Sequence, residues 1–517
     1  MLLATSDMIK KIDRYAADML GIPISELIDR SGEAVARVVR ARVKKGARIV
    51  VLAGKGNNGA DGYMTAAKLL CDYDVIVYDI FGEGASSEGA RAAADIYKGM
   101  NGRVIISDES QNISDELSSA DCLIDAVFGT GFYGEIPSKI RELSSVIDKI
   151  QGVDKIAIDL PIGVSSDDGS VDCTGVYNAS ATVALSFAKP AHFSYPAKKH
   201  IGKLYYDNIG LHKTDILRNF DFKYRVLDTD ESRSLVSHRE DNSNKGTFGK
   251  LLLITGSQEY LGAGVLTLEA ALRGGVGYVT HLGEKEQNEI LLQRFPETVF
   301  KCRSTAFNMD EDEVNLIVSL SEKHTVTLIG SGCGNTEGLY RLVTALISCD
   351  GGPIVLDADA INVLATHREE SISLISNSPR DIVITPHPLE FSRLIGIDVD
   401  QVQNNRISLA RKFAEECKCV VVLKGAATIV TDGLMTYINS SGSSALAKAG
   451  SGDVLAGYLA SCIASSGNVL ASSALSVYIH GVAGDNLAAK LSESGVTPSD
   501  LPVEMAKAMC EIAGKNI

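Results

Sequence analysis

Short apolar runs rich in valine, isoleucine and leucine alternate with longer segments of helical periodicity along most of this chain. Such runs are typical of parallel strands that are buried on both faces, with helices connecting them. The alternation therefore predicts an α/β fold built on parallel sheets. The strands predicted in the first part of the chain are 48–53, 75–80, 122–127 and 155–160.

A polar stretch without a clear period, at 211–224, interrupts this alternation before it starts again. A chain of 517 residues exceeds the size of one ordinary core, so we place a domain boundary between residues 211 and 228. The predicted domains are 1–215 and 225–517. The second has predicted strands at 249–255, 278–282, 325–329, 353–356, 381–385 and 420–423, and a hairpin over 427–438.

Composition excludes several classes of protein. A formal charge of −15 with no basic tract argues against a nucleic-acid or anionic membrane partner. The ten cysteines form no CxxC pair, which fits reduced thiols in the cytoplasm better than a disulfide framework or zinc site. There is no signal-peptide pattern and no apolar run of membrane-spanning length, so we expect a cytoplasmic, soluble enzyme.

A glycine-rich turn follows the first predicted strand. Gly54, Gly56 and Gly59 satisfy G-x-G-x-x-G between a strand and a helix, and Asp79 lies twenty residues beyond, so a Rossmann dehydrogenase is one alternative. Asn57, Asn58 and Asp61 disfavour it, because a carboxylate beside a phosphate is unfavourable. These side chains suit a polar ring or sugar and a monovalent cation, or else an ordinary capped turn.

Two more predicted strands end in an aspartate that is followed by a turn containing glycine. Asp125 precedes a turn containing Gly129 and Gly131, and Asp159 precedes Gly163. Ligands of open α/β sheets bind beyond the carboxyl ends of the strands. Because three polar strand ends converge at one edge, the sequence predicts a binding site there.

The sharpest signal in the second domain is Gly450-Ser451-Gly452-Asp453 at the start of a long helix. Free N–H groups and the helix dipole favour an anion at such a place, and glycines allow a phosphoryl group to approach. Asp453 can accept a proton from a substrate hydroxyl, or it can be a plain capping residue. No G-x-x-x-x-G-K-[ST] occurs, so a P-loop enzyme is excluded.

Weaker signals follow three other predicted strands. Lys424–Thr428 suits a polyphosphate, His387 lies in a Pro-flanked turn, and Gly330–Gly334 forms a glycine-rich turn. A lone loop histidine is more often merely exposed than functional. The Lys424–Thr428 signal is weak alone and gains weight beside the Gly-Ser-Gly-Asp turn.

Residues 1–210 resemble the NAD(P)H-hydrate epimerase family, which has a Rossmann-like α/β/α fold. The matching motifs are "GNNGADG" from Gly56, "DAVFGTG" from Asp125, "DLPIG" from Asp159, and Lys189-Pro190. The resemblance implies Asp159 as acid/base for inversion at C6 of the hydrated nicotinamide, with Lys189 nearby, and a potassium ion at Asn58, Asp125 and Ile162. It implies a hydrate pocket made of Asn57, Asn58, Gly59, Ala60, Asp61, Gly129, Thr130, Gly131, Phe132, Tyr133, Gly134, Glu135 and Asp159.

Two positions depart from the family's motifs. Ala60 replaces a glycine, which matters only if φ is positive there. Ile162 replaces a serine or threonine, so a hydroxyl ligand to potassium is lost. Either the backbone carbonyl of Ile162 is the ligand, or the affinity for the cation is reduced.

Residues 228–517 resemble the ADP- or ATP-dependent NAD(P)H-hydrate dehydratase family, which has a ribokinase-like fold. The motifs include "GSGCG", "DADAIN", "TPHPLEF", "LKGAATI" and "GSGDVLAG", whereas 442–447 departs from the family's usual "GNPGMA". The resemblance implies Asp453 as catalytic base, Mg²⁺ as cofactor and ADP as co-substrate. It implies hydrate contacts at Ala263, Gly334, His387 and Asp453, and nucleotide contacts at Lys424, Gly425, Ala426, Ala427, Thr428 and Gly452.

Together the halves resemble a bifunctional NAD(P)H-hydrate repair enzyme. The resemblance implies that the first domain interconverts the R and S hydrates of NADH and NADPH. The second would dehydrate the S form while ADP becomes AMP and phosphate, with a homo-oligomer expected. The main alternative is a vitamin or sugar kinase fused to a Rossmann-like domain, and a catalytically silent NAD-binding scaffold is another. The choice between ADP and ATP, and between NADH and NADPH hydrates, stays open.

Overall fold

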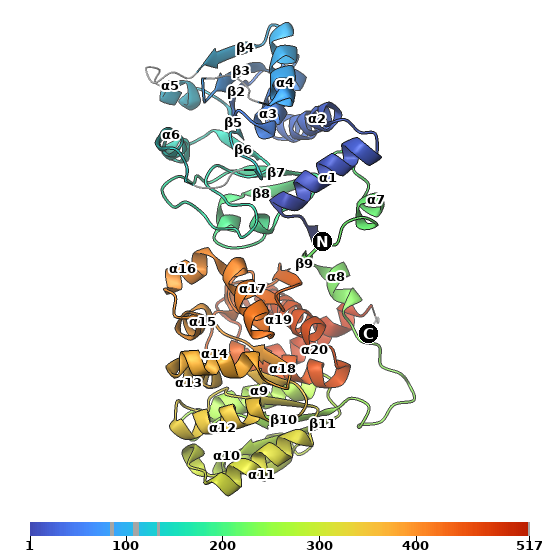
Figure 1. The fold of residues 1–517 in the computed structure, drawn as a ribbon, viewed down its shortest axis with the longest axis vertical. Helices are drawn as coiled ribbons and strands as arrows, with labels where there is room; N and C mark the ends of the chain where they lie inside the picture. The colour runs from blue at the N-terminus through green and yellow to red at the C-terminus, as the bar shows by residue number, and fades with distance from the viewer. Residues whose placement is uncertain (83–86, 107–112, 132–134, 515–517) are drawn as a thin grey trace. The chain divides into compact units, whose positions relative to one another are not determined.

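The computed structural model describes residues 1–82, 87–106, 113–131 and 135–514. The chain divides into two compact units, Leu2–Tyr224 and Arg225–Ile517, and Met1 groups with the second (Figure 1). Each unit has its own sheet and its own buried apolar core. The prediction of two α/β folds with parallel sheets is confirmed.

The N-terminal unit has a seven-stranded sheet among its described residues, in the order β4-β3-β2-β5-β6-β7-β8. All neighbouring strands in it are parallel. The order reverses between β2 and β5, which is where ligands enter such sheets. Its strands are β2 (Arg48–Ala53), β3 (Asp74–Asp79), β4 (Arg103–Ile106), β5 (Cys122–Ala126), β6 (Asp154–Ile158), β7 (Ala181–Leu185) and β8 (Lys203–Asp207), and a short β1 (Leu2–Leu3) opens the unit.

Helices cover both faces of this sheet, because alternate strand residues point to opposite sides. Ile49 and Val51 of β2 pack in a core with helices α1 to α4, whereas Val50 and Leu52 pack with α5 and α6 (Figure 1). This is the expected α/β/α sandwich. The helices are α1 (Ser6–Met19), α2 (Ile24–Arg42), α3 (Asn57–Leu69), α4 (Glu88–Gly99), α5 (Ile113–Ser118), α6 (Ser138–Lys149) and α7 (Lys213–Leu217), with 3₁₀ turns η1 (Pro190–His192) and η2 (Ala197–His200).

The predicted strands of this unit correspond to β2, β3, β5 and β6, with bounds shifted by up to two residues. One shift corrects the prediction that Asp159 ends a strand. Strand β6 stops at Ile158, and Asp159 takes a left-handed conformation with φ of 66°. The sequence pattern did not predict β4, β7, β8 or the helix α7 inside the polar stretch 211–224.

In the C-terminal unit the strand order is β9-β18-β17-β16-β15-β14-β13-β10-β11-β12. The strands from β12 to β16 are parallel, and β17 and β18 form the predicted antiparallel hairpin. The order reverses between β10 and β13. The strands are β9 (Tyr224–Leu227), β10 (Lys250–Ile254), β11 (Tyr278–Gly283), β12 (Val299–Cys302), β13 (Val326–Ile329), β14 (Ile354–Leu356), β15 (Ile382–Ile384), β16 (Val420–Leu423), β17 (Ile429–Thr431) and β18 (Thr436–Asn439).

The longest helices of this unit, α18 and α19, pack with α9 and α20 in its main apolar core. In the described part of the chain, no helix is long and apolar enough to cross a membrane. The helices are α8 (Thr229–Ser234), α9 (Leu261–Arg273), α10 (Lys285–Arg294), α11 (Glu311–Glu322), α12 (Glu337–Ser348), α13 (Asp359–Thr366), α14 (Arg368–Ser376), α15 (Pro388–Ile395), α16 (Val399–Asn404), α17 (Arg406–Cys417), α18 (Ser451–Ser466), α19 (Val469–Leu491) and α20 (Leu501–Ile512), with 3₁₀ turns η3 (Thr305–Phe307), η4 (Ser444–Leu446) and η5 (Pro498–Asp500).

Two candidate active sites at the strand ends

A cavity of about 670 Å³ opens at the carboxyl ends of the N-terminal strands. Helices α1 and α2 and the loops after β2, β5, β6 and β7 line it. Glu135 is exposed and does not line the cavity, Gly59 and Ala60 are buried in the first turn of α3, and 132–134 lie outside the described residues. The predicted residues that line it are Asn57, Asn58, Asp61, Gly129, Thr130, Gly131 and Asp159.

The glycine-rich turn after β2 allows two loops to approach each other closely. A Cβ on Gly54 would lie 2.1 Å from the carbonyl oxygen of Val127, and one on Gly59 would lie 1.9 Å from that of Gly54. Only glycine fits these places. Asn57 is the first residue of α3, after the N-cap Gly56, so the two asparagines are not capping residues.

Asp159 and Lys189 form a buried ion pair at the floor of the cavity. Lys189 is 1% exposed and also donates to the carbonyl oxygen of Leu185 at 2.9 Å. Asp159 and Ser186, both cavity residues, adopt left-handed backbone conformations. Such strain in non-glycine residues is concentrated at functional sites. The structure thus brings together the two residues that the sequence paired through the epimerase motifs.

Two further carboxylates, Asp13 and Asp61, line the same cavity. Burial raises the pKa of Asp13 to about 6, against the opposing effect of Lys189. Desolvation, and then the neighbouring Asp159 and Asp13, raise the pKa of Asp61 well above its usual range. The motifs pointed to Asp61 but not to Asp13, which comes from the amphipathic helix α1. The only signal for Asp13 in the sequence was its position beside the apolar face of an amphipathic helix.

Asp125, predicted to hold potassium, is fully buried beside the cavity and does not line it. Its oxygens accept from the backbone N–H groups of Val127 (3.0 Å) and Ile162 (2.9 Å) and from the Tyr177 hydroxyl (3.0 Å). Burial raises its pKa to about 6. These three donors are neutral, so they do not compensate the carboxylate charge. The Asn58 amide donates to the carbonyl oxygen of Phe128 at 2.9 Å.

In the C-terminal unit, Asp453 lies in the first turn of α18, as predicted. The N-cap Gly450 has a φ of 101°, a conformation that favours glycine. Burial and the Asp357 carboxylate raise the pKa of Asp453 to about 7, although Lys424 opposes the shift. Gly452 lies beside Lys424, since a Cβ there would be 3.4 Å from Nζ. The helix N-terminus and this lysine therefore face the same place.

Lys424 follows β16 and contacts two buried carboxylates. Its Nζ lies 3.1 Å from Asp357 and 4.0 Å from Glu390. Neither carboxylate was singled out from the sequence, although Asp357 begins the "DADAIN" motif and Glu390 lies in "TPHPLEF". Beyond Lys424, Gly425 has a φ of 138° and its carbonyl accepts from Thr428 at 2.9 Å. Gly425 and Ala426 are exposed, whereas Ala427 and Thr428 are buried.

The other three of the four predicted hydrate contacts come from separate elements at this edge. His387 is the N-cap of α15, where its ring accepts from Glu390 N and it is about half-exposed. Gly334 N donates to Asp359 at 2.8 Å. Ala263 lies in α9 against the turn after β13, since a Cβ on Gly332 would be 2.5 Å from its methyl group. His387 is therefore not the merely exposed loop residue that its sequence context allowed.

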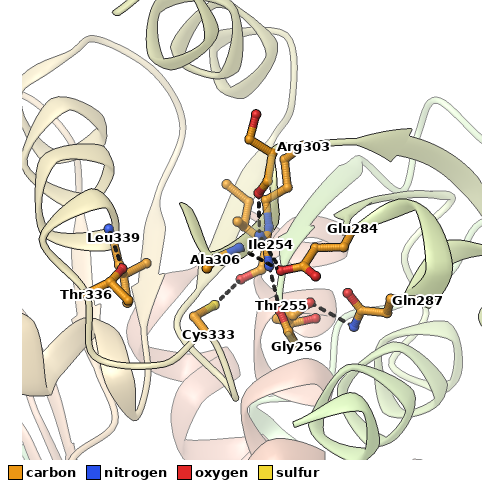
Figure 2. A network of polar contacts seen from close by, with 12 residues as sticks. Ile254, Thr255, Gly256, Glu284, Gln287, Arg303, Ala306, Cys333, Thr336 and Leu339 are labelled. Carbon is orange, nitrogen blue, oxygen red and sulfur yellow. Dashed lines mark hydrogen bonds and ion pairs between the residues drawn. The ribbon is translucent and has the colours of Figure 1, made fainter. Parts of the chain in front are cut away.

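Figure 2 shows a network of polar contacts among residues that follow β10, β11 and β12. The Arg303 guanidinium, fully buried, contacts Glu284 at 3.2 Å and donates to the carbonyl oxygen of Gly256 at 2.7 Å. Ala306 N donates to Glu284 at 3.0 Å, and Gln287 donates to the carbonyl oxygen of Thr255 at 3.1 Å. Arg303 and Glu284 had no signal in the sequence.

Hydrogen bonds continue from this network to Lys424. Gly256 N donates to the carbonyl oxygen of Ser331 at 2.8 Å, and the Ser331 hydroxyl donates to Asp357 at 2.8 Å. Asp357 in turn accepts from Lys424 at 3.1 Å. A continuous path of polar contacts, from Arg303 through Gly256, Ser331 and Asp357 to Lys424, thus crosses the strand ends.

Comparison with known proteins assigns both halves. The family profile described as YjeF-related protein N-terminus matches residues 24–191, and the one described as NAD(P)H-hydrate dehydratase matches 251–507. The bifunctional NAD(P)H-hydrate repair enzyme Nnr of Moorella thermoacetica is 31% identical over 514 residues, 97% of this chain and 95% of that one. The chain belongs to the family of bifunctional NAD(P)H-hydrate repair enzymes. It is an enzyme with an epimerase part and a dehydratase part.

Other relatives agree with this assignment. The repair enzyme Nnr of Escherichia coli is 30% identical over 503 residues, 96% of this chain and 92% of that protein. Among solved structures, a ribokinase-like protein from Enterococcus faecalis is 25% identical with a TM-score of 0.50, covering 57% of this chain and 99% of that one. The repair function is therefore favoured over a vitamin or sugar kinase fused to a Rossmann-like domain.

Proposed function

We propose that the cavity of the N-terminal unit interconverts the R and S hydrates of NADH and NADPH. The observation that carries this proposal is the buried Asp159–Lys189 pair at the floor of that cavity, within the epimerase motifs. A carboxylate beside a buried ammonium is held ionised. Asp159 can then take the proton of the C6 hydroxyl as the C6–N1 bond breaks and C6 becomes a carbonyl carbon. It returns the proton to that oxygen when N1 adds back to the opposite face of C6, which inverts the carbon. Asn57, Asn58, Asp61 and the 129–131 turn would bind the rest of the hydrate, and the predicted contacts at Gly59, Ala60, 132–134 and Glu135 belong to the same proposal.

The C-terminal site would dehydrate the S hydrate. Asp453 would take the proton of the C6 hydroxyl. The hydroxyl oxygen would then attack the terminal phosphoryl group of ADP, and AMP would leave. The phosphate would then depart from C6 while a proton leaves C5, which restores the double bond. Phosphate is a better leaving group than hydroxide, and the N–H groups of α18 would stabilise the transferring phosphoryl group. Ala263, Gly334 and His387 would bind the hydrate.

Lys424, Gly425–Thr428 and Gly452 would bind the nucleotide, since the lysine and the helix N-terminus face the same place. Mg²⁺ would enter with the phosphates, because it is usually held by one or two carboxylates and substrate oxygens. Asp357 and Glu390 fit that role, as both carboxylates already approach a cation in Lys424. The ion would neutralise charge on the transferring group. We write the step with ADP as the donor and compare ADP with ATP in the assay.

Potassium would be held by Asn58, Asp125 and Ile162. Asp125 fits a monovalent cation because its three donors are neutral and leave its buried charge uncompensated. The N–H of Ile162 already donates to Asp125, so that residue could supply only its carbonyl oxygen as a ligand. We also propose that the protein is a cytoplasmic homo-oligomer and that residues 1–215 and 225–517 form separate domains.

Absorbance recovery on a mixture of R- and S-hydrated NADH tests the whole proposal. With ADP or ATP and Mg²⁺, the full chain should restore all of the NADH, and omission of the nucleotide should stop recovery. A stable phosphorylated product without NADH recovery would contradict the dehydratase role and favour a kinase. The same assay with hydrated NADPH measures the preference between the two cofactors.

A further inference from the structure

His192 connects the two residues at the floor of the epimerase cavity through its two ring nitrogens. Its Nδ1 accepts from the backbone N–H of Lys189 at 3.0 Å, and its Nε2 lies 2.7 Å from the backbone oxygen of Asp159. Because Nδ1 accepts a hydrogen bond, Nε2 must carry the ring proton and donate it to Asp159. These contacts determine the tautomer.

The ring is well placed to keep this single arrangement. His192 ends the 3₁₀ turn η1 and is 2% exposed, so water does not compete for its nitrogens. Burial, and then the Lys189 charge, lower its pKa to about 4, which keeps the ring neutral at physiological pH. Neutral imidazole is the form that can accept from Lys189 and donate to Asp159 at the same time.

Asp159 needs such support because its backbone is strained. A φ of 66° in a residue other than glycine costs free energy, of the order of 1–3 kcal/mol in general, and persists only where neighbours hold it. The N–H of Asp159 donates to Val183 of β7 at 2.9 Å, and its carbonyl is held by His192. Its side chain pairs with Lys189. His192 thus holds the backbone carbonyl of Asp159, and this restrains the direction of the Asp159 side chain.

We propose that His192 is a positioning residue for epimerisation, which fixes the left-handed Asp159 and the start of the Lys189 turn so that their side chains meet. This inference rests on the proposed function of Asp159. His192 is not among the residues that line the cavity, so it acts through Asp159 rather than by touching the hydrate. A displacement of about 1 Å in a catalytic group can cost about 10²-fold in rate.

Two substitutions separate the two contacts of the ring. In His192→Gln, the side-chain amide nitrogen can take the place of Nε2 and donate to Asp159. In His192→Asn, the shorter side chain can take the place of Nδ1 with its oxygen and accept from Lys189, but it cannot reach Asp159. Both variants keep a polar side chain of similar character in the same buried place. They therefore differ in which of the two contacts is kept, the one to Asp159 in His192→Gln and the one to Lys189 in His192→Asn.

The measurement is the rate of conversion of R to S hydrate by the full chain, with kcat and KM determined separately. We expect His192→Asn to lower kcat about 10²-fold with little change in KM, and His192→Gln to remain within about tenfold of the parent. Dehydration of pure S hydrate should be unchanged, because the other unit carries it out. The thermal unfolding of each variant, followed by circular dichroism, should match that of the parent protein, which shows that the N-terminal unit is folded. Equal loss in both variants, or a rise in KM alone, would overturn the positioning role.

Asp159→Asn is measured beside them. If that variant still epimerises at the parent rate, the proposed function of Asp159 fails whatever His192 does. If Asp159→Asn is inactive and His192→Asn is fully active, only the inference about His192 fails. Should His192→Asn unfold at a lower temperature than the parent protein, the pair His192→Gln and His192→Phe repeats the comparison, with retained activity expected for glutamine alone.

Discussion

The two units place an aspartate and a lysine at their strand ends, but in different partnerships. In the N-terminal unit Lys189 pairs with Asp159 itself. In the C-terminal unit Lys424 pairs with Asp357 and Glu390, and Asp453 stands beside this group at the start of α18. Lys189 therefore contacts Asp159 directly, whereas burial and neighbouring carboxylates raise the pKa of Asp453 to about 7. The same two residue types thus form one carboxylate in direct contact with a lysine and one whose pKa lies near neutral pH.

The largest expected effect is that of Asp453→Asn. An asparagine keeps the shape of the first turn of α18 but cannot accept the hydroxyl proton, so dehydration should fall about 10²–10⁴-fold. Conversion of R to S hydrate should be unchanged, because the other unit carries it out. Chromatography of the hydrates checks both rates in one sample. Near-normal dehydration would remove Asp453 from the chemistry.

Asp159→Asn should have the converse phenotype. Conversion of R to S hydrate should be lost by a similar factor of about 10²–10⁴ at any potassium concentration, while pure S hydrate is dehydrated normally. This change leaves the Lys189 ammonium buried without its partner, which is destabilising. The double variant Asp159→Asn with Lys189→Met removes that charge and is the control. Epimerisation at the parent rate would exclude Asp159.

The pH dependence of the two activities should differ. A general base works when deprotonated, and the pKa of Asp453 is raised to about 7. Dehydration should therefore fall as the pH drops through 7, by about tenfold per unit below it, and reach a plateau above. Epimerisation in the same buffers should not follow the Asp453 transition, and its pH dependence should instead reflect the carboxylates of its own cavity, Asp13 with a pKa of about 6 and Asp61. Initial rates with saturating substrates between pH 5 and 9 test this, and a flat dehydration profile would contradict it.

Separating the units should have a smaller effect on overall repair. A protein of residues 225–517 has its own sheet and core, so we expect it to fold and to dehydrate only the S hydrate. It should leave about half of a racemic mixture unrepaired on a short timescale, since it lacks the epimerase. Circular dichroism checks the fold. A folded but inactive fragment would show that the two units share one site.

The smallest effect is expected from Asp125→Asn. Loss of its charge should weaken the response of epimerisation to potassium, without abolishing activity and without changing dehydration. Rates measured over a potassium series, with sodium keeping the ionic strength constant, give the response. If the variant responds to potassium like the parent protein, Asp125 is not a ligand.

The sequence predicted the parallel core of each sheet because strands such as β2 and β16 are continuous apolar runs. Edge strands carried a weaker pattern. In β4 and β8 polar and apolar residues are mixed and partly exposed, so neither stood out. The bounds of β6 were wrong for a similar reason, since Leu160 extends the apolar run although Asp159 already leaves the strand.

Site residues inside motifs could be found from their spacing, and those outside could not. Asp159, Lys189, Lys424 and Asp453 lie at strand ends or helix starts, where local sequence determines the backbone. Asp13 reaches the same cavity from α1, and Arg303 meets Glu284 across two strands. These positions depend on how elements far apart in the chain pack together, which the hydrophobic periodicity of the sequence does not show.

The path of hydrogen bonds from Gly256 through Ser331 and Asp357 to Lys424 joins the turn beside Ala263 to the lysine proposed to bind phosphate. A nucleotide that engages Lys424 competes with Asp357 for its ammonium group. Any resulting change in the affinity for the hydrate must, by thermodynamic linkage, appear as an equal change in the affinity for the nucleotide. The two substrates of this site would then be coupled through the protein before any phosphoryl group is transferred.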